Sequence, residues 1–97
     1  MATPNIVPRA DSEGGLGTAS KYWASAYIDT ITTTGNINLP DDAKIIVGTG
    51  GDGEIYSGGL HLTIANVTSN SDILFKGNDG GSTITALTLD MSDAGAA

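Results

Sequence analysis

The clearest pattern along the chain is an alternation of apolar and polar side chains over residues 60–65. Leu60, Leu62 and Ile64 fall on one side of this run, while a histidine and a threonine fall on the other. A period of two residues is typical of a β-strand with one buried and one exposed face. The pattern therefore predicts a half-buried strand over residues 60–65.

Other runs are rich in isoleucine, threonine and valine, and most of them end at glycine, proline or polar turns. β-Branched residues lose side-chain freedom in a helix and pack well on a pleated sheet, so these runs are expected to form strands. They are Ile28–Thr33, Asn36–Leu39, Lys44–Val47, Glu54–Ser57, Asp72–Lys76 and Thr83–Met91. We expect a turn at Gly77–Gly81 between the last two. No window of about 11 residues within residues 28–91 carries apolar residues at helical spacing, which predicts an all-β fold with little or no helix.

The first 21 residues differ in composition from the rest of the chain. They contain prolines and glycines among small polar residues, a composition that stops helices and offers little to bury. We therefore expect an extended lead-in over residues 1–21 and a β-structured segment over residues 22–97. Near this junction Trp23 and Tyr27 are four residues apart, a spacing that suits either a short helical turn or one face of a strand.

The supply of core-forming side chains is small. Isoleucine, leucine, valine and phenylalanine make up 21 of the 97 residues, close to the roughly 20% below which chains tend to stay disordered. The chain has no cysteine for disulfides and no Cys and His cluster for a structural zinc ion. Oligomerisation is a common source of stability for such a domain, because a subunit interface buries apolar area that one chain leaves in water. We therefore expect an oligomer.

The chain is acidic, with a formal net charge of −7 and a pI near 4.1. Only Arg9, Lys21, Lys44 and Lys76 carry positive charge to meet phosphate groups, which argues against nucleic acids and anionic membranes as partners. No apolar run approaches the roughly 18 residues of a membrane span, and the N-terminus lacks the basic-then-apolar order of a secretory signal. We therefore expect synthesis in the cytoplasm and no membrane insertion.

Candidate catalytic side chains are few. His61 is the single histidine, and its place on the polar side of the alternating run is typical of a solvated residue. No Gly-x-Ser-x-Gly sequence marks a nucleophile. The carboxylate pairs Asp41–Asp42 and Asp52–Glu54 lie in runs typical of surface turns, in a chain whose core is too thin to frame a sugar groove. We therefore expect no enzymatic activity.

The run Gly50–Glu54 begins like the Gly-Gly-x-Gly-x-Asp repeat of calcium-binding β-rolls. Ile55 stands where that repeat requires its ligand aspartate, and no second copy follows. The Gly-Lys-Ser or Gly-Lys-Thr signature of a phosphate-binding loop is absent as well. We expect the glycines to serve turns, and we expect neither a metal nor a cofactor.

Several stretches of the chain resemble a motif that recurs in phage tail fibres and tailspikes. Arg9–Trp23 and Ala26–Ile28 show its order of Leu-Gly, small polar residues, an aromatic residue and then Tyr-Ile entering a strand. Thr32–Ile37 resembles the Thr-Thr-Gly-x-Ile strand and turn unit that repeats along such fibres. Residues 71–76 and 87–97 also resemble fibre repeats, so the resemblance covers most of the chain.

This resemblance implies an elongated, intertwined homotrimer in which three chains wrap round one axis as a β-prism or a triple-stranded β-helix. It also implies a structural role in the virion tail, where a stiff trimer spaces or presents the part that binds a host cell-surface glycan or protein receptor. Such a segment belongs to a longer fibre. A shared axis agrees with the small apolar supply, because three copies direct their apolar residues at one core and pair exposed strand edges.

The core shared by the three chains is expected to consist of apolar residues on the strands and two aromatic residues ahead of them. These are Trp23, Tyr27, Ile37, Leu39, Ile45, Val47, Leu60, Leu62, Ile64, Ile73, Phe75, Leu87 and Leu89. An alternative hypothesis is that the segment itself binds host glycan. Trp23, Tyr56 and the loops at 48–53 and 77–82 are the candidates, since aromatic faces stack on sugar rings and loops supply hydrogen bonds.

Overall fold

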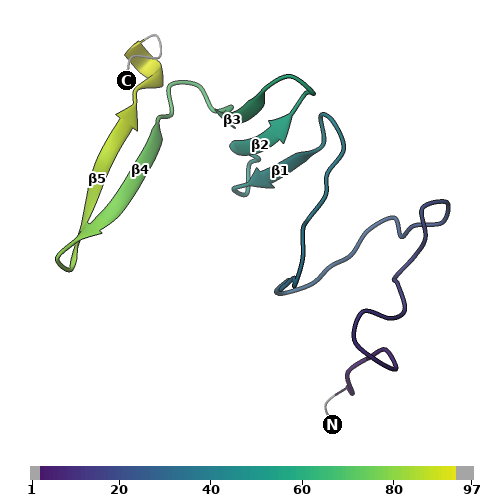
Figure 1. Cartoon of the computed structure of the whole chain (residues 1–97). Coiled ribbons are helices and arrows are strands. Elements are labelled where there is room, and N and C mark those ends of the chain that lie inside the picture. Colours follow the sequence, from purple (N-terminus) through teal and green to yellow (C-terminus); the bar gives the residue numbers. More distant parts are fainter. Residues whose placement is uncertain (1–2, 94–97) are drawn as a thin grey trace. The chain divides into compact units, whose positions relative to one another are not determined.

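The computed structural model describes residues 3–93, which belong to two units (Figure 1). The first unit ends at Gly35 and the second begins at Asn36. All regular secondary structure of the described residues lies in the second unit.

The described residues of the second unit, 36–93, contain five strands and one short 3-10 helix. The strands are β1 (Lys44–Val47), β2 (Gly53–Ser57), β3 (Leu62–Asn66), β4 (Ile73–Asp79) and β5 (Ser82–Leu89), and the 3-10 turn η1 spans Met91–Asp93. They form a three-stranded sheet in the order β1-β2-β3 and a two-stranded sheet of β4 and β5. Both sheets are antiparallel. The described residues contain no α-helix, so the all-β prediction is confirmed.

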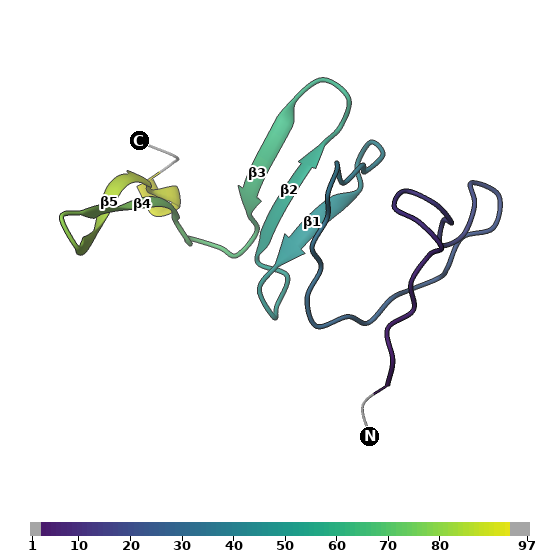
Figure 2. The ribbon, with the colours of Figure 1, turned by 60° about the horizontal axis from the view of Figure 1, so that its bottom comes forward.

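The first sheet is a meander whose strands lie side by side in Figure 2. Its centre is a row of three isoleucines, because Ile45 pairs with Ile55 and Ile55 pairs with Ile64. At one end Gly53 pairs with Val47, and a Cβ atom at Gly53 would come within 2.7 Å of the Val47 Cγ2 atom. Only glycine at this position lets the valine side chain lie over the neighbouring strand.

The second sheet is a hairpin closed by the two-residue turn Gly80-Gly81, which Asp79 and Ser82 flank as a pair. Both glycines have positive φ, 60° and 103°, as a type I′ turn requires at its two central positions. The Gly81 N–H also donates to the Asn78 Oδ1 atom at 2.7 Å. This turn fixes the register of the hairpin.

A β-bulge interrupts the hairpin beyond the turn. Phe75 pairs with Leu87 and Lys76 pairs with Thr85, which leaves Ala86 without an opposite residue. An extra residue shifts the alternation of side chains by one position. Ile84 therefore lies on the same face as Leu87, three residues along the chain instead of two.

Several predicted strand boundaries differ from the observed ones. The strand predicted at 60–65 begins two residues later, at Leu62, and β4 continues to Asp79 instead of ending at Lys76. The strands predicted at Ile28–Thr33 and Asn36–Leu39 are absent from the structure. A strand needs a neighbour to satisfy its N–H and C=O groups, and no strand within the described part of this chain pairs with either segment.

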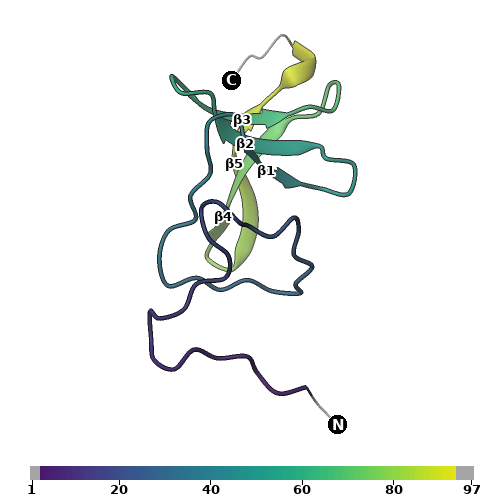
Figure 3. The same cartoon turned by 90° about the vertical axis from the view of Figure 1, so that its right-hand side faces the viewer.

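The first unit is held by local turns, and Figure 3 shows its described residues as a trace without arrows or coils. Thr18 and Lys21 exchange backbone hydrogen bonds of 2.8 and 3.2 Å across a tight turn. Arg9 and Glu13 form an exposed ion pair of 2.9 Å. Exposed pairs of this kind contribute little to stability, so local geometry and not packing organises this unit.

The described residues contain no buried side chain, whether apolar or polar. They also contain no helix long and apolar enough to cross a membrane. The strands carry intermediate or exposed residues throughout. One chain therefore forms sheets without forming a core.

Candidate functional site

One face of the three-stranded sheet is apolar. Residues directly opposite one another in antiparallel strands share a face, so the register places five aliphatic side chains together: Ile45, Val47, Ile55, Leu62 and Ile64. All five are exposed to solvent, Leu62 to 73% and Ile64 to 53%. We call this set the sheet face. Its residues have the chemistry of a protein core and the exposure of a surface.

The opposite face of the same sheet is mixed, since polar contacts lie there beside Ile46, whose side chain is 59% exposed. The Lys44 ammonium group lies 3.0 Å from the Glu54 Oε1 atom and 4.8 Å from the centre of the Tyr56 ring. The hydrogen bond to the Glu54 carboxylate is the main cause that raises the pKa of Lys44 above its ordinary value of 10.5, and it outweighs the opposing effect of desolvation. The sheet thus has one face with five exposed aliphatic side chains and one mixed face that holds an ion pair.

A shallow depression of about 190 Å³ lies at one end of the sheet face. Ile45, Ile55 and Leu62 line it from the strands, and Ile37 and Leu39 line it from the segment ahead of β1. One backbone hydrogen bond ties the end of this segment to β2, because the Asp42 N–H donates to the Ser57 carbonyl at 2.8 Å. The depression is open and mostly aliphatic, which suits an apolar side chain better than a polar ligand.

The hairpin has a similar apolar face. The register and the bulge place Ile73, Phe75, Ile84, Leu87 and Leu89 together, and we call this set the hairpin face. Phe75, Ile84 and Leu87 are exposed, while Ile73 and Leu89 are half-buried. The opposite face carries threonine, lysine and asparagine together with Leu74, which is 48% exposed. Both sheets therefore present an uncovered apolar side.

A hydrogen-bonded corner joins the two sheets. The Val67 N–H donates to the Asp52 carbonyl at 2.7 Å, and the Thr68 hydroxyl group donates to the Asp52 carboxylate. The Asn66 side-chain amide donates to the Asp72 carbonyl at 3.2 Å. The Asp72 carboxylate in turn accepts the Met91 N–H at 3.1 Å. These carboxylates serve as acceptors that order the backbone.

The structure places eight of the residues predicted for the shared core on two separate apolar faces. Four of them lie on the sheet face, namely Ile45, Val47, Leu62 and Ile64, and four lie on the hairpin face, namely Ile73, Phe75, Leu87 and Leu89. Ile37 and Leu39 reach the edge of the sheet face through the depression. The existence of a common core between chains stays a prediction, since these positions describe one chain.

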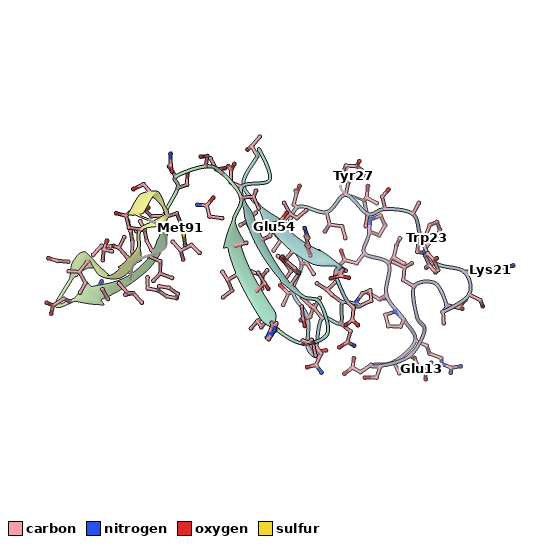
Figure 4. The ribbon with its side chains drawn as sticks, turned by 90° about the horizontal axis from the view of Figure 1, so that it is seen from above. Glu13, Lys21, Trp23, Tyr27, Glu54 and Met91 are labelled. Carbon is pink, nitrogen blue, oxygen red and sulfur yellow. The ribbon has the colours of Figure 1, made fainter. Side chains whose placement is uncertain are left out.

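Three predicted core residues lie on neither face. Leu60 belongs to the loop between β2 and β3 and is 89% exposed, because the strand begins after it. Trp23 and Tyr27 belong to the first unit, where both are exposed (Figure 4). The Trp23 ring lies near Gly17, where an added Cβ atom would meet the Trp23 Cδ1 atom at 3.6 Å.

Sequence reasoning missed Ile55 and Ile84 as members of the two faces. Ile55 lies in a short run without apolar alternation, between Glu54 and Tyr56, and only its pairing with two other isoleucines reveals its face. Ile84 is out of phase with Leu87 in a regular strand, and the bulge brings it into phase. The sequence does signal that bulge, because the threonines of this strand change their spacing from two residues to three, at Thr83, Thr85 and Thr88.

The side chains considered for catalysis do not converge. His61 is exposed in the loop that precedes β3. Asp52 accepts the Thr68 hydroxyl group, and Glu54 pairs with Lys44 on the polar face of the sheet. Within residues 3–93 no three His, Cys, Asp or Glu side chains are placed to share a metal ion. What the described residues offer is apolar surface.

Comparisons with protein-family models, with curated proteins and with solved structures find no match for this chain. Function is therefore inferred from the residues and from their arrangement. The two uncovered apolar faces are the feature that any account of function has to explain.

Proposed function

We propose that this chain is a structural segment of a phage tail fibre or tailspike and that it works as a homotrimer. The proposal of an oligomer rests on two observations: none of the described residues is buried, and the sheet face and the hairpin face are exposed. Contiguous apolar surface of this kind marks a site of association in soluble proteins. The number of chains and the phage context come from the resemblance of residues 9–37 to fibre motifs.

The role that follows is mechanical and positional. Three chains round a common axis make a stiff segment, directed outward on the virion tail, that spaces or presents the part of the fibre that binds a host glycan or protein receptor. The segment itself has no enzymatic role in this proposal, and it contacts neither nucleic acid nor the interior of a membrane. The net charge of −7 favours solubility of such an assembly.

Light scattering on the purified chain tests the assembly, with an expected mass of about three times 9.8 kDa. Immunogold electron microscopy of virions from the phage that encodes the chain tests the location. Antibodies against the chain are expected to label the tail. Labelling of the capsid alone, or of no particle, contradicts the tail assignment whatever the mass is.

A second candidate function is direct binding of host glycan by the first unit. A depression of about 410 Å³ in this unit is lined by Leu16, Lys21, Tyr22 and Trp23, and the Trp23 side chain is 68% exposed. Aromatic faces of this kind stack on sugar rings. Tyr56 is a weaker candidate for sugar stacking than the chain's sequence alone suggests, because it is half-buried and the Lys44 ammonium group lies over its ring.

A glycan array probed with the wild-type chain and with Trp23→Ala tests this candidate. Binding that the substitution abolishes supports it, with Thr63→Ala in the second unit as a control that is expected to leave binding unchanged. An array without signal, or a signal that Trp23→Ala does not reduce, assigns the segment to a scaffold role alone.

A further inference from the structure

Strand β5 is an edge strand without charged residues to protect it. Its eight residues, Ser82–Leu89, include no charged residue, no proline and no glycine. Proteins block free edges with charges, prolines or short strands, since an open edge presents unpaired N–H and C=O groups to other chains. The bulge at Ala86 is the one irregularity, and it leaves the half nearer the turn, Ser82–Thr85, regular.

The hairpin is too small to be stable by itself. A two-stranded hairpin is marginal in water, and three or more strands or a covering layer are needed for independent stability. The described residues add no third strand to β4 and β5. The hairpin face is also left uncovered, with Phe75, Ile84 and Leu87 exposed. Both the edge and the face therefore require a partner.

The charge distribution favours another copy of the same hairpin as that partner. The chain carries a net charge of −7, which opposes association of most of its surface with itself. Residues 73–89 are an exception, because they contain one lysine, Lys76, and one acidic residue, Asp79. Hairpins of neighbouring copies approach one another without net repulsion, and β4 and β5 have similar lengths of seven and eight residues.

We propose that the free edge of β5 pairs with the free edge of β4 in a neighbouring copy. The inference rests on the proposed function, which supplies the second and third copies. In that arrangement β5 of each chain lies antiparallel to β4 of the next, so three hairpins close into a ring that has no free edge. The three hairpin faces then point inward and cover one another.

The register identifies the backbone groups that make the new bonds. In an antiparallel pair alternate residues direct their N–H and C=O groups toward the partner, beginning with the pair that flanks a two-residue turn. Ser82 flanks the turn and Ile84 is two residues further, so their amides face β4. The amides of Thr83 and Thr85 face away from β4. These two amides are free in one chain and bonded in the proposed ring.

Hydrogen exchange measured by NMR on the whole chain tests the pairing. The Ile84 amide serves as the internal reference for a folded hairpin, and the Thr83 and Thr85 amides are expected to be protected to a similar degree. In a sample that mixes isotope-labelled and unlabelled chains, contacts are expected between β5 of one chain and β4 of another.

The outcomes separate this inference from the proposed function. A mass of three chains with rapid exchange at Thr83 and Thr85 overturns the edge pairing and leaves the trimer intact. Interchain contacts from β5 to a strand other than β4, or to no strand, overturn it as well. A monomeric mass overturns both proposals.

A proline substitution gives an independent readout. Thr85→Pro removes an amide that faces away from β4, and an edge strand tolerates proline where the amide faces solvent. If the edge is paired between chains, the concentration at which half of the trimers dissociate is expected to rise by about tenfold or more. Thr85→Val keeps the amide and is expected to leave that concentration unchanged. An equal effect of both variants, or an effect of neither, contradicts the pairing.

Discussion

Leu62 offers the sharpest test of the idea that the sheet face is buried between copies. In one chain its side chain is 73% exposed, so in a monomer Leu62→Ala is expected to change stability by less than about 0.5 kcal/mol, as surface substitutions do. If another copy covers the sheet face, about 130 Å² of Leu62 leaves water, worth about 3 kcal/mol per chain at about 25 cal/mol per Å². Truncation of a buried leucine costs about 2 to 5 kcal/mol, and a trimer contains the change three times.

The assay is denaturation by guanidinium chloride, followed by circular dichroism at several protein concentrations. A trimer makes the midpoint rise with concentration, and Leu62→Ala is expected to lower the midpoint at every concentration. Thr63→Ala is the matched control, since the next residue of β3 points to the opposite face. A Leu62→Ala cost below about 0.5 kcal/mol per chain would refute burial of the sheet face.

Three further outcomes are expected. Gly81 has a φ of 103°, so Gly81→Ala is expected to destabilise the hairpin by about 1 to 2 kcal/mol. Thermal unfolding measures this, and an unchanged midpoint contradicts it. Thr68→Val removes the hydrogen bond to Asp52 and is expected to lower the free energy of unfolding by about 0.5 to 1.5 kcal/mol. Calorimetry measures this change, and a value near zero contradicts the prediction. The raised pKa of Lys44 means that its ion pair stabilises the sheet below pH 10.5 and loses that effect as pH rises through the raised pKa. The difference in melting temperature between wild type and Lys44→Met should therefore vanish at high pH. A difference that is independent of pH contradicts a stabilising role of the ion pair.

Local sequence signals predicted the strands that pair with near neighbours in the chain. β1 was predicted with its observed bounds, and β2, β3 and β5 within one or two residues at most of their ends. Glycine-rich turns connect β1 to β2, β2 to β3 and β4 to β5, and there pattern and turn chemistry agree. Residues 28–39 have similar β-branched composition, but composition does not supply a partner strand, and none is present within the described residues of one chain.

The candidate site was predictable as a list of apolar residues and less so as a surface. Alternation identified Leu62 and Ile64, but the role of Ile55 depends on cross-strand pairing, which follows from register and not from its own neighbours in the chain. Ile84 depends on a bulge that shifts the phase of β5. Leu60 continues the alternation of β3 by sequence, yet the strand starts after it, because pairing with β2 begins at Leu62.

Sedimentation equilibrium combined with circular dichroism measures whether other copies of this chain cover its apolar faces. The expected result is a β-sheet spectrum in a species of about three times 9.8 kDa, with the spectrum lost on dilution as the assembly dissociates. A single 9.8 kDa chain that keeps its β-sheet spectrum and unfolds cooperatively would contradict the account.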